Sequence, residues 1–358
     1  MRVTARGLAL GLAGLLAAGA LFAWSGLLNV SASSGHWAIT SWFLHAVMRQ
    51  SVETHAGGIE APDLDDPAMV LRGAGHFATG CAYCHGAPGK PPSPAVRNMT
   101  PAPPRLGGTL REWEPAELFW IVRHGIKFTG MPAWPAPERA DEVWSVVAFL
   151  RALPGMAPET YRRLAHGPAS AEGRADAGAA LTSCARCHGF DGSGRGAGAF
   201  PVLSGQNEAY LLASLRAFAS GSRASGIMET AVNALDDEAL SDLARHYARQ
   251  PRPERPAAPP PAAALAAEGE RIFNEGLPRQ RVPACASCHG RRGDAPRYPS
   301  YPRLAGQPRH YLETQLELFA AGSRGGTSFS HVMTMVAGRL EPAQIEAVAA
   351  WLASPPPQ

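Results

Sequence analysis

Six cysteines stand in three pairs of the same spacing, and a histidine directly follows each pair. The three motifs are Cys81-Ala82-Tyr83-Cys84-His85, Cys184-Ala185-Arg186-Cys187-His188 and Cys285-Ala286-Ser287-Cys288-His289. Two thiols three residues apart on one helical turn can both add to the vinyl groups of a porphyrin, and the histidine can then bind the iron from the same side. The pattern therefore predicts three covalently attached c-type haems.

Paired cysteines also occur in zinc sites, in thioredoxin-like dithiols and in disulfides. With 12 histidines among 358 residues, a histidine follows a given pair by chance about 1 time in 30, and three such coincidences favour haem over each alternative. A zinc site would not need a histidine at that position. The haem motifs use all six cysteines and leave none for a conventional disulfide, which suits export to an oxidising compartment.

A low-spin haem iron that transfers electrons needs a sixth ligand, and a methionine thioether raises its potential. The candidates are Met131, 46 residues after His85, Met228, 40 after His188, and Met333, 44 after His289. In the third unit Met335 is the alternative, although repeat register favours Met333. Met99 lies only 14 residues after His85 and is a poorer candidate for crossing the haem. A methionine more often simply fills space in a hydrophobic core, so the prediction rests on the similar spacing in all three units.

A proline recurs two residues before a leucine between each histidine and its methionine. The segments are Pro104-Arg105-Leu106, Pro201-Val202-Leu203 and Pro302-Arg303-Leu304. An iron-bound histidine usually donates its other ring proton to a carbonyl or carboxylate, which fixes the ring orientation. We expect the proline carbonyl to be that acceptor. The alternative is a proline that serves only a turn.

The second and third motifs lie in copies of one module. At an offset of 101 residues the matching positions are Pro201/Pro302, Leu203/Leu304, Gly205/Gly306, Gln206/Gln307, Tyr210/Tyr311, Leu215/Leu316, Phe218/Phe319 and Gly221-Ser222-Arg223/Gly322-Ser323-Arg324. Met228 then matches Met333 at an offset of 105, so the third copy has four extra residues. The first unit is more distant.

Two segments separate the units. The proline- and alanine-rich stretch from Pro251 to Ala264 indicates a semi-rigid spacer, and a weaker boundary lies between Pro154 and Ala171. The predicted division is a membrane anchor at 1–34, a juxtamembrane segment at 35–59, and haem domains at 60–155, 171–250 and 265–354.

Each unit closes with apolar residues at helical spacing, and no alternating strand pattern stands out. The stripes are Val143, Val146, Val147 and Leu150; Leu240, Leu243 and Tyr247; and Ile345, Val348 and Leu352. The predicted fold class is all-α, with three tandem domains behind an N-terminal transmembrane helix.

Leu8 to Leu28 is an almost wholly apolar run behind Arg2 and Arg6. As a helix it is roughly 31 Å long, close to the hydrocarbon thickness of a bilayer. Arginines before the run place its start in the cytoplasm, so we expect the rest in the periplasm, anchored to the bacterial inner membrane. A signal peptide cleaved after Val30-Ser31-Ala32 is the alternative. The following segment to Ile59 suits either the lipid interface or a connecting helix.

Together these motifs resemble class I cytochromes c, in the order Cys-x-x-Cys-His, Pro-x-Leu, Met and C-terminal helix. The second and third units are similar to dihaem cytochromes of the c-four type, notably in the segment from Tyr298 to Gln307. The first unit, with Gly125-Ile126-Lys127-Phe128-Thr129-Gly130-Met131-Pro132-Ala133-Trp134, resembles monohaem membrane-anchored bacterial cytochromes. The resemblance implies a small helical fold around each haem, His/Met ligation, the proline carbonyl bond and one exposed haem edge.

With both axial positions filled, the iron has no open site for a substrate, which favours an electron carrier over an enzyme. The expected partner is a redox protein: a terminal oxidase, a quinol-oxidising complex or a dehydrogenase. The net charge of +3 is too small to indicate nucleic-acid binding. Alternatives are the cytochrome subunit of a periplasmic dehydrogenase and a multihaem peroxidase, in which His331, Met333 and Met335 would compete for the third iron. Arginines around the third motif could steer an acidic partner or pair with haem propionates: Arg291, Arg292, Arg297, Arg303 and Arg309.

Overall fold

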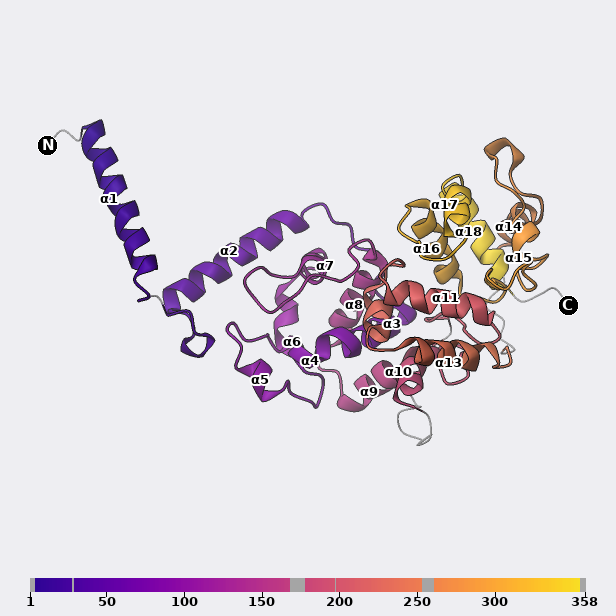
Figure 1. Cartoon of the computed structure of the whole chain (residues 1–358), viewed down its shortest axis with the longest axis horizontal. Helices are drawn as coiled ribbons and strands as arrows, with labels where there is room; N and C mark the ends of the chain where they lie inside the picture. The colour runs from indigo at the N-terminus through magenta and orange to yellow at the C-terminus, as the bar shows by residue number, and fades with distance from the viewer. Residues whose placement is uncertain (1–3, 28, 168–177, 197, 253–260, 355–358) are drawn as a thin grey trace.

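The protein is described by a computed structural model over residues 4–27, 29–167, 178–196, 198–252 and 261–354. Helices dominate throughout (Figure 1). Across these described ranges there is no strand, and the only β contacts are three isolated bridges. The all-α prediction is confirmed. Part of the predicted spacer, residues 253–260, lies outside the described residues.

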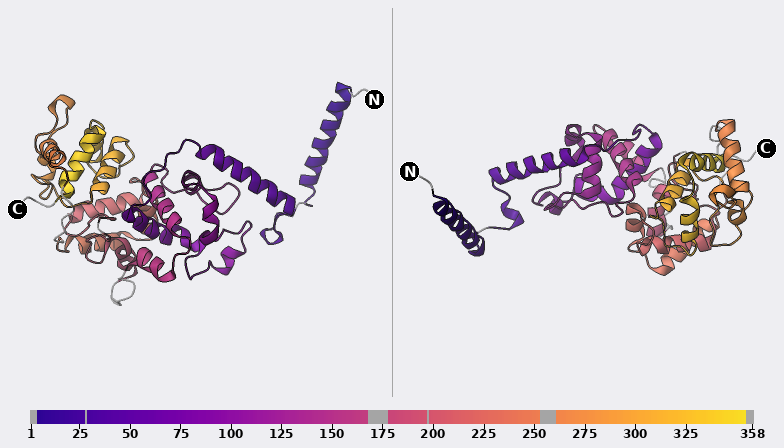
Figure 2. Two further views of the ribbon diagram at one scale, coloured as in Figure 1. Left: turned by 180° about the vertical axis from the view of Figure 1, so that it is seen from behind. Right: turned by 90° about the horizontal axis from the view of Figure 1, so that it is seen from above.

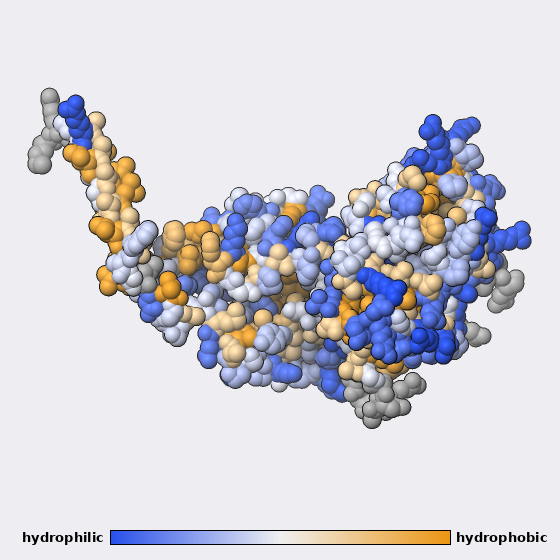
Figure 3. Space-filling model, viewed as in Figure 1, coloured by the Kyte–Doolittle hydropathy of each residue, from blue (hydrophilic) through white to orange (hydrophobic). Residues whose placement is uncertain are grey.

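Two long helices open the chain and extend away from the remainder (Figures 1 and 2). They are α1 (Ala5–Trp24) and α2 (Ala38–Ala56), separated by the short η1 (Ala32–Ser34). No residue of α1 is buried, and its mean hydropathy of 1.9 and 20-residue length suit a membrane span. A signal sequence satisfies the same criteria. Apolar side chains cover α1 and continue onto the start of α2 (Figure 3).

The second half of α2 packs on the first haem-motif unit. Arg49 forms an ion pair with Glu112 at 3.1 Å, and its guanidinium lies over the Trp113 ring, 4.9 Å from the centroid. His55 contacts Trp120, with ring centroids 5.6 Å apart. The segment is therefore a helix docked at one end, and its first half carries exposed aromatic side chains.

We call the helices around the three cysteine motifs the first, second and third units. The first unit contains α3 (Pro67–His76), the π-helix η2 (Phe77–Cys81), α4 (Ala82–His85), α5 (Pro94–Arg97), α6 (Leu106–Thr109), η3 (Leu110–Glu112), α7 (Pro115–His124), α8 (Ala140–Ala152) and α9 (Pro158–His166). Its core joins α3, α7, α8 and α9. Tyr161 and Ala165 of α9 belong to this core, beyond the residue 155 at which the sequence pattern ended the first unit.

The second unit contains α10 (Ala179–His188), α11 (Glu208–Ala219), α12 (Gly226–Val232) and α13 (Asp237–Ala248). The third contains α14 (Ala263–Glu275), η5 (Pro278–Gln280), α15 (Ala286–His289), α16 (Arg309–Ala320), α17 (Ser330–Ala337) and α18 (Pro342–Ala353). The three apolar stripes predicted to close the units lie on α8, α13 and α18 and are buried in their cores.

Close helix contacts in the first and third units depend on glycine. A Cβ at Gly73 of α3 would overlap the Ser145 carbonyl of α8, and a Cβ at Gly269 of α14 would overlap the Ala347 carbonyl of α18. Because no side chain intervenes, the helix before each cysteine motif lies directly on the closing helix. This crossing fixes where the motif begins.

Candidate haem sites

The three Cys-x-x-Cys-His motifs end their helices in the same way. His85, His188 and His289 are the last residues of α4, α10 and α15. The next residue is a glycine with a left-handed φ of 73°, 79° and 81° at Gly86, Gly189 and Gly290. Each glycine N–H donates to a carbonyl four residues back, which closes the helix. Sequence analysis missed these glycines, although the repeated Cys-x-x-Cys-His-Gly was the signal.

Each histidine donates its Nδ1 proton to a proline carbonyl. The Nδ1–O distances are 2.9 Å for His85 and Pro104, 3.2 Å for His188 and Pro201, and 3.1 Å for His289 and Pro302. The predicted acceptor is confirmed in all three units. Because Nδ1 holds the proton, Nε2 keeps a lone pair for a metal. Burial lowers the pKa of each imidazole while the proline carbonyl opposes it, which favours the neutral form that binds iron.

The first cysteine of each motif, Cys81, Cys184 and Cys285, packs against an apolar core, and none of the six cysteines forms a disulfide. Burial raises the pKa of Cys81 to about 12 and those of Cys184 and Cys285 to about 11. A catalytic or zinc-bound cysteine needs a stabilised thiolate, and these positions oppose that charge. A thioether carries no charge and fits the same surroundings. The donor set therefore fits covalently attached haem.

A cavity of about 340 Å³ opens beside the first histidine. Its lining combines Phe77, His85 and Leu106 with the glycine- and proline-rich loop that follows the motif and with Leu153 and Met156. Lys90 and Arg105 also line it, whereas Cys81, Cys84 and Met131 are not among its lining residues. Across the described parts of the chain, no three His, Cys, Asp or Glu side chains converge as a conventional metal cluster.

The three candidate methionines are all half-buried, and each lies just before the closing helix of its unit. Met131 lies in the loop between α7 and α8, and its N–H is held by Thr129 Oγ1 at 3.0 Å. Met228 and Met333 lie on α12 and α17. Met335 is 54% exposed. Met99 was the poorer candidate, but its side chain packs against Gly130, next to Met131. Their assignment as ligands stays a prediction.

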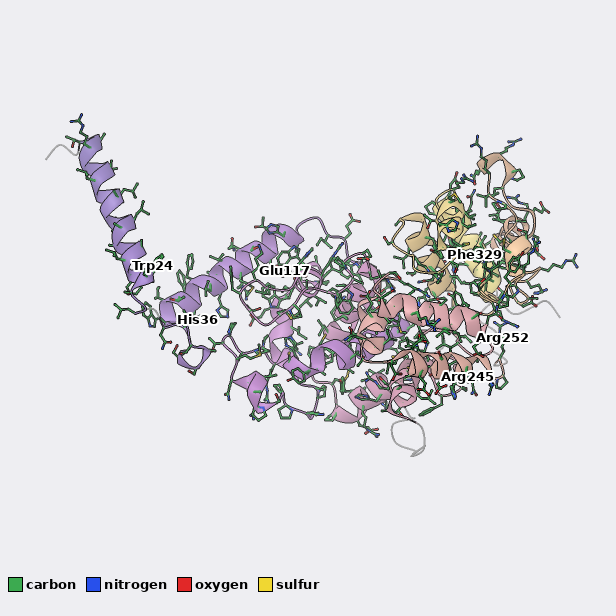
Figure 4. All side chains as sticks on the ribbon, in the orientation of Figure 1. Trp24, His36, Glu117, Arg245, Arg252 and Phe329 are labelled. Carbon is green, nitrogen blue, oxygen red and sulfur yellow. The ribbon has the colours of Figure 1, made fainter. Side chains whose placement is uncertain are left out.

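In the third unit a series of aromatic rings joins the histidine to the methionine segment. Tyr301 lies 6.1 Å from His289 and 5.0 Å from Phe329, measured between ring centroids. Phe329 directly precedes α17 and lies at the surface of the third unit (Figure 4). The Met333 segment therefore begins at a partly exposed aromatic contact.

The second and third units meet through reciprocal hydrogen bonds beside their proline carbonyls. Gln307 accepts from the Val202 N–H at 2.9 Å and donates to the Val202 carbonyl at 2.7 Å. Gln206 accepts from the Arg303 N–H at 2.8 Å and donates to its carbonyl at 3.0 Å. Arg223 and Arg324 continue the symmetry, since they bond the hydroxyls of Tyr311 and Tyr210 at 3.3 Å and 2.9 Å. Each unit thus holds the backbone next to the proline carbonyl that accepts from the histidine of the other unit.

Comparison with known proteins identifies the family. The model of the family "Cytochrome C oxidase, cbb3-type, subunit III" matches residues 68–150, and the cytochrome c model matches residues 175–246 and 266–355. The thiosulfate dehydrogenase electron acceptor of Thiomonas intermedia is 39% identical over 174 residues, which cover 49% of this chain and 79% of that protein. The chain belongs to the class I c-type cytochromes.

Cytochrome c4 of Pseudomonas aeruginosa is 34% identical to this cytochrome over 187 residues, which cover 52% of this chain and 90% of that protein. The crystal structure of reduced cytochrome c4 from Pseudomonas stutzeri shares 32% identity and covers 51% of this chain and 99% of that one, with a TM-score of 0.44. Family membership establishes covalent c-type haem as the cofactor and electron transfer as the activity.

Proposed function

We propose that this cytochrome is a membrane-anchored triheme carrier that relays single electrons between a respiratory complex or dehydrogenase and a terminal acceptor. The observation that carries the proposal is the threefold repetition of a Cys-x-x-Cys-His motif whose histidine is held by a proline carbonyl. The attachment residues are Cys81, Cys84, Cys184, Cys187, Cys285 and Cys288, and the axial pairs are His85/Met131, His188/Met228 and His289/Met333.

The bound haems would supply one-electron redox chemistry. The chain's residues hold each imidazole in one orientation, pack apolar side chains against the first cysteine of each motif and place a thioether before each closing helix. We assign the haem domains to residues 60–155, 171–250 and 265–354, with α9 packed onto the first.

A relay requires neighbouring sites to be close, and contacts between the first two units support this. A Cβ at Gly75 of α3 would lie 3.3 Å from Cys187 Sγ, and Arg186 donates to Thr79 Oγ1 at 3.0 Å. Cys81 follows Gly75 by six residues, roughly 9 Å along a helix axis. The second motif therefore lies on the helical segment that leads into the first.

Two observations refine the partner proposal. Relatives named as thiosulfate dehydrogenase electron acceptors favour a dehydrogenase as the electron donor. Of the arginines around the third motif, Arg309 is engaged by Glu313 and Glu346, both at 2.7 Å. The candidate docking residues are thereby reduced to Arg291, Arg292, Arg297 and Arg303. If they steer an acidic partner, the reaction rate falls as ionic strength rises.

Mass spectrometry of the mature protein tests the haem count. Three added macrocycles are expected, and replacing both cysteines of one motif by alanine should remove one. A wild-type protein carrying fewer than three would refute the triheme proposal. Anchoring is tested separately by washing membranes with high salt, after which the haem should remain with the membrane. Release of an intact protein shortened near Ala32 would show cleavage instead.

A further inference from the structure

A buried carboxylate lies at the boundary between the first and second units. Glu142 of α8 is 4% exposed and accepts four interactions. Its Oε1 receives Ser225 Oγ at 2.5 Å and Arg139 at 2.9 Å. Its Oε2 receives Gly226 N–H at 2.8 Å and Trp134 Nε1–H at 3.1 Å. We call these five residues the Glu142 node.

All four partners of Glu142 are donors, two on each oxygen. Burial raises the pKa of Glu142, while Arg139, Ser225 and Trp134 lower it. The Arg139 guanidinium and the N–H groups of Gly226 and Trp134 can only donate, so three of the four contacts favour the ionised form. A buried carboxylate is tolerated only when its hydrogen bonds are complete, and loss of a partner is costly. Two of the donors, Ser225 and Gly226, come from the second unit. The node therefore forms only when the two units are docked.

The node reaches the methionine segment of the second unit through the start of α12. Ser225 is the N-cap of that helix, and its Oγ accepts the Met228 N–H at 3.1 Å. Gly226 is the first helical residue, and a Cβ there would lie 2.5 Å from Trp134 Nε1. Arg139 also donates to the Ala224 carbonyl at 3.0 Å. The first unit thus binds Ala224, Ser225 and Gly226, which precede Met228.

Among the residues that the structure describes, no carboxylate of another unit binds the matching place in the third unit. Ser330 corresponds to Ser225 at the 105-residue offset, but its Oγ donates to the Thr327 carbonyl within the same loop at 2.9 Å. The N-cap of α17 is Phe329, which makes no side-chain capping bond. Support from a carboxylate in another unit is therefore a feature of Met228 and not of the repeat.

We propose that Glu142 is a positioning residue: from the first unit it fixes the Met228 segment and so holds the sixth ligand of the haem attached to the second unit. The inference rests on the proposed function, since it takes Met228 as that ligand. Iron–thioether bonds are weak, so a ligand segment held in place keeps its sulfur at the metal when an unsupported segment would release it. The geometry points to a dependence of the second site on docking of the first unit.

The test uses the full-length holoprotein with the E142Q variant. Glutamine keeps the size but turns one oxygen into a donor that faces other donors. We expect E142Q to lose one of the three methionine-to-iron charge-transfer contributions in the far red of the ferric spectrum. The reduced variant should bind carbon monoxide at one additional site. S225A should show the same loss to a smaller extent, and S330A, the matched control, should show none.

Mass spectrometry first establishes that every variant carries the same number of haems. The M228A variant then separates the two proposals. If M228A removes one contribution while E142Q and S225A keep all three, the positioning role is wrong and the ligand assignment stands. If M228A removes none, the assignment of Met228 and the inference both fail. Loss from the third unit in E142Q would also overturn the inference, because it would show a general rather than a local effect.

Discussion

Met228 and Met333 occupy the same place in two copies of one module, yet their surroundings differ. The segment before Met228 is bound by a neighbouring unit through Glu142 and Arg139 and lies against Trp134. The loop before Met333 contacts the second unit at Arg324 and Gly326, but the start of its helix is held within its own loop and by the edge of one aromatic ring. The repeat places a methionine before the closing helix, whereas the rigidity of that methionine depends on what the unit packs against.

The largest expected effect comes from removing the ligands themselves. M228A and M333A should each lower the potential of one haem by on the order of 100 mV or more, because a thioether stabilises ferrous iron. Spectroelectrochemical titration of the three haems measures this. M335A is the control for the third unit and should leave all potentials unchanged. A shift in M335A with none in M333A would reassign the third ligand.

As the pH falls, Met228 should leave the iron at a higher pH than Met333. His76 lies 6.2 Å from Trp134 between ring centroids, and burial lowers its pKa to about 4 against smaller opposing contributions from the Glu142 backbone and Asp141. The unfolded state binds this proton at a higher pH than the folded state does. The free energy of unfolding that His76 contributes above pH 6.5 therefore falls by about 3 kcal/mol as the pH is lowered toward 4.

We therefore expect the Met228 charge-transfer absorption to disappear at a higher pH than that of Met333, as followed by acid titration. H76Q should make the free energy of unfolding depend less steeply on pH in this range. Burial also lowers the pKa of His310 to about 4. His310 belongs to the third unit and bonds Arg72 of the first unit at 3.0 Å, so H310Q removes the pH dependence that comes from the contact between those two units. An unchanged slope in H76Q would assign the acid sensitivity to other groups.

The interface between the second and third units should be unequal despite its symmetry. Q307A leaves a fully buried N–H and carbonyl of Val202 unpaired and should cost about 2 kcal/mol. Q206A leaves the partly buried groups of Arg303 unpaired and should cost about 1 kcal/mol. Urea unfolding followed by haem absorption measures both. Equal losses would mean that solvent does not reach the Arg303 side.

The smallest effect concerns the aromatic support of the third unit. F329A removes the edge contact with Tyr301 and should destabilise the Met333 segment by about 1 kcal/mol. The midpoint for loss of its charge-transfer absorption on heating measures the change. Phe128 is 97% exposed and gives the control, since F128A should change nothing. Equal midpoints for F329A and the wild type would show that the loop hydrogen bonds alone hold this segment.

Local signals in the sequence predicted much of this molecule. The closing helices and the acceptor carbonyls at Pro104, Pro201 and Pro302 follow from short-range spacing and repetition, and the structure confirms both. The Glu142 node has no such signal, because Ser225 lies 83 residues away and a lone glutamate on an apolar helix has no periodic partner. The packing of α9 onto the first core was missed for the same reason. The methionine ligands and the domain limits remain predictions.

The paired glutamines have a consequence for how the chain holds together. Gln206 reaches the third unit as Gln307 reaches the second, so a single surface meets a copy of itself, as in a two-fold homodimer. Such a surface needs no covalent connection to be self-complementary, and tethering only raises the effective concentration of one half near the other. Cutting the chain between these halves should therefore leave two fragments that still associate, and an ancestor with one such half would already have contained the whole interface.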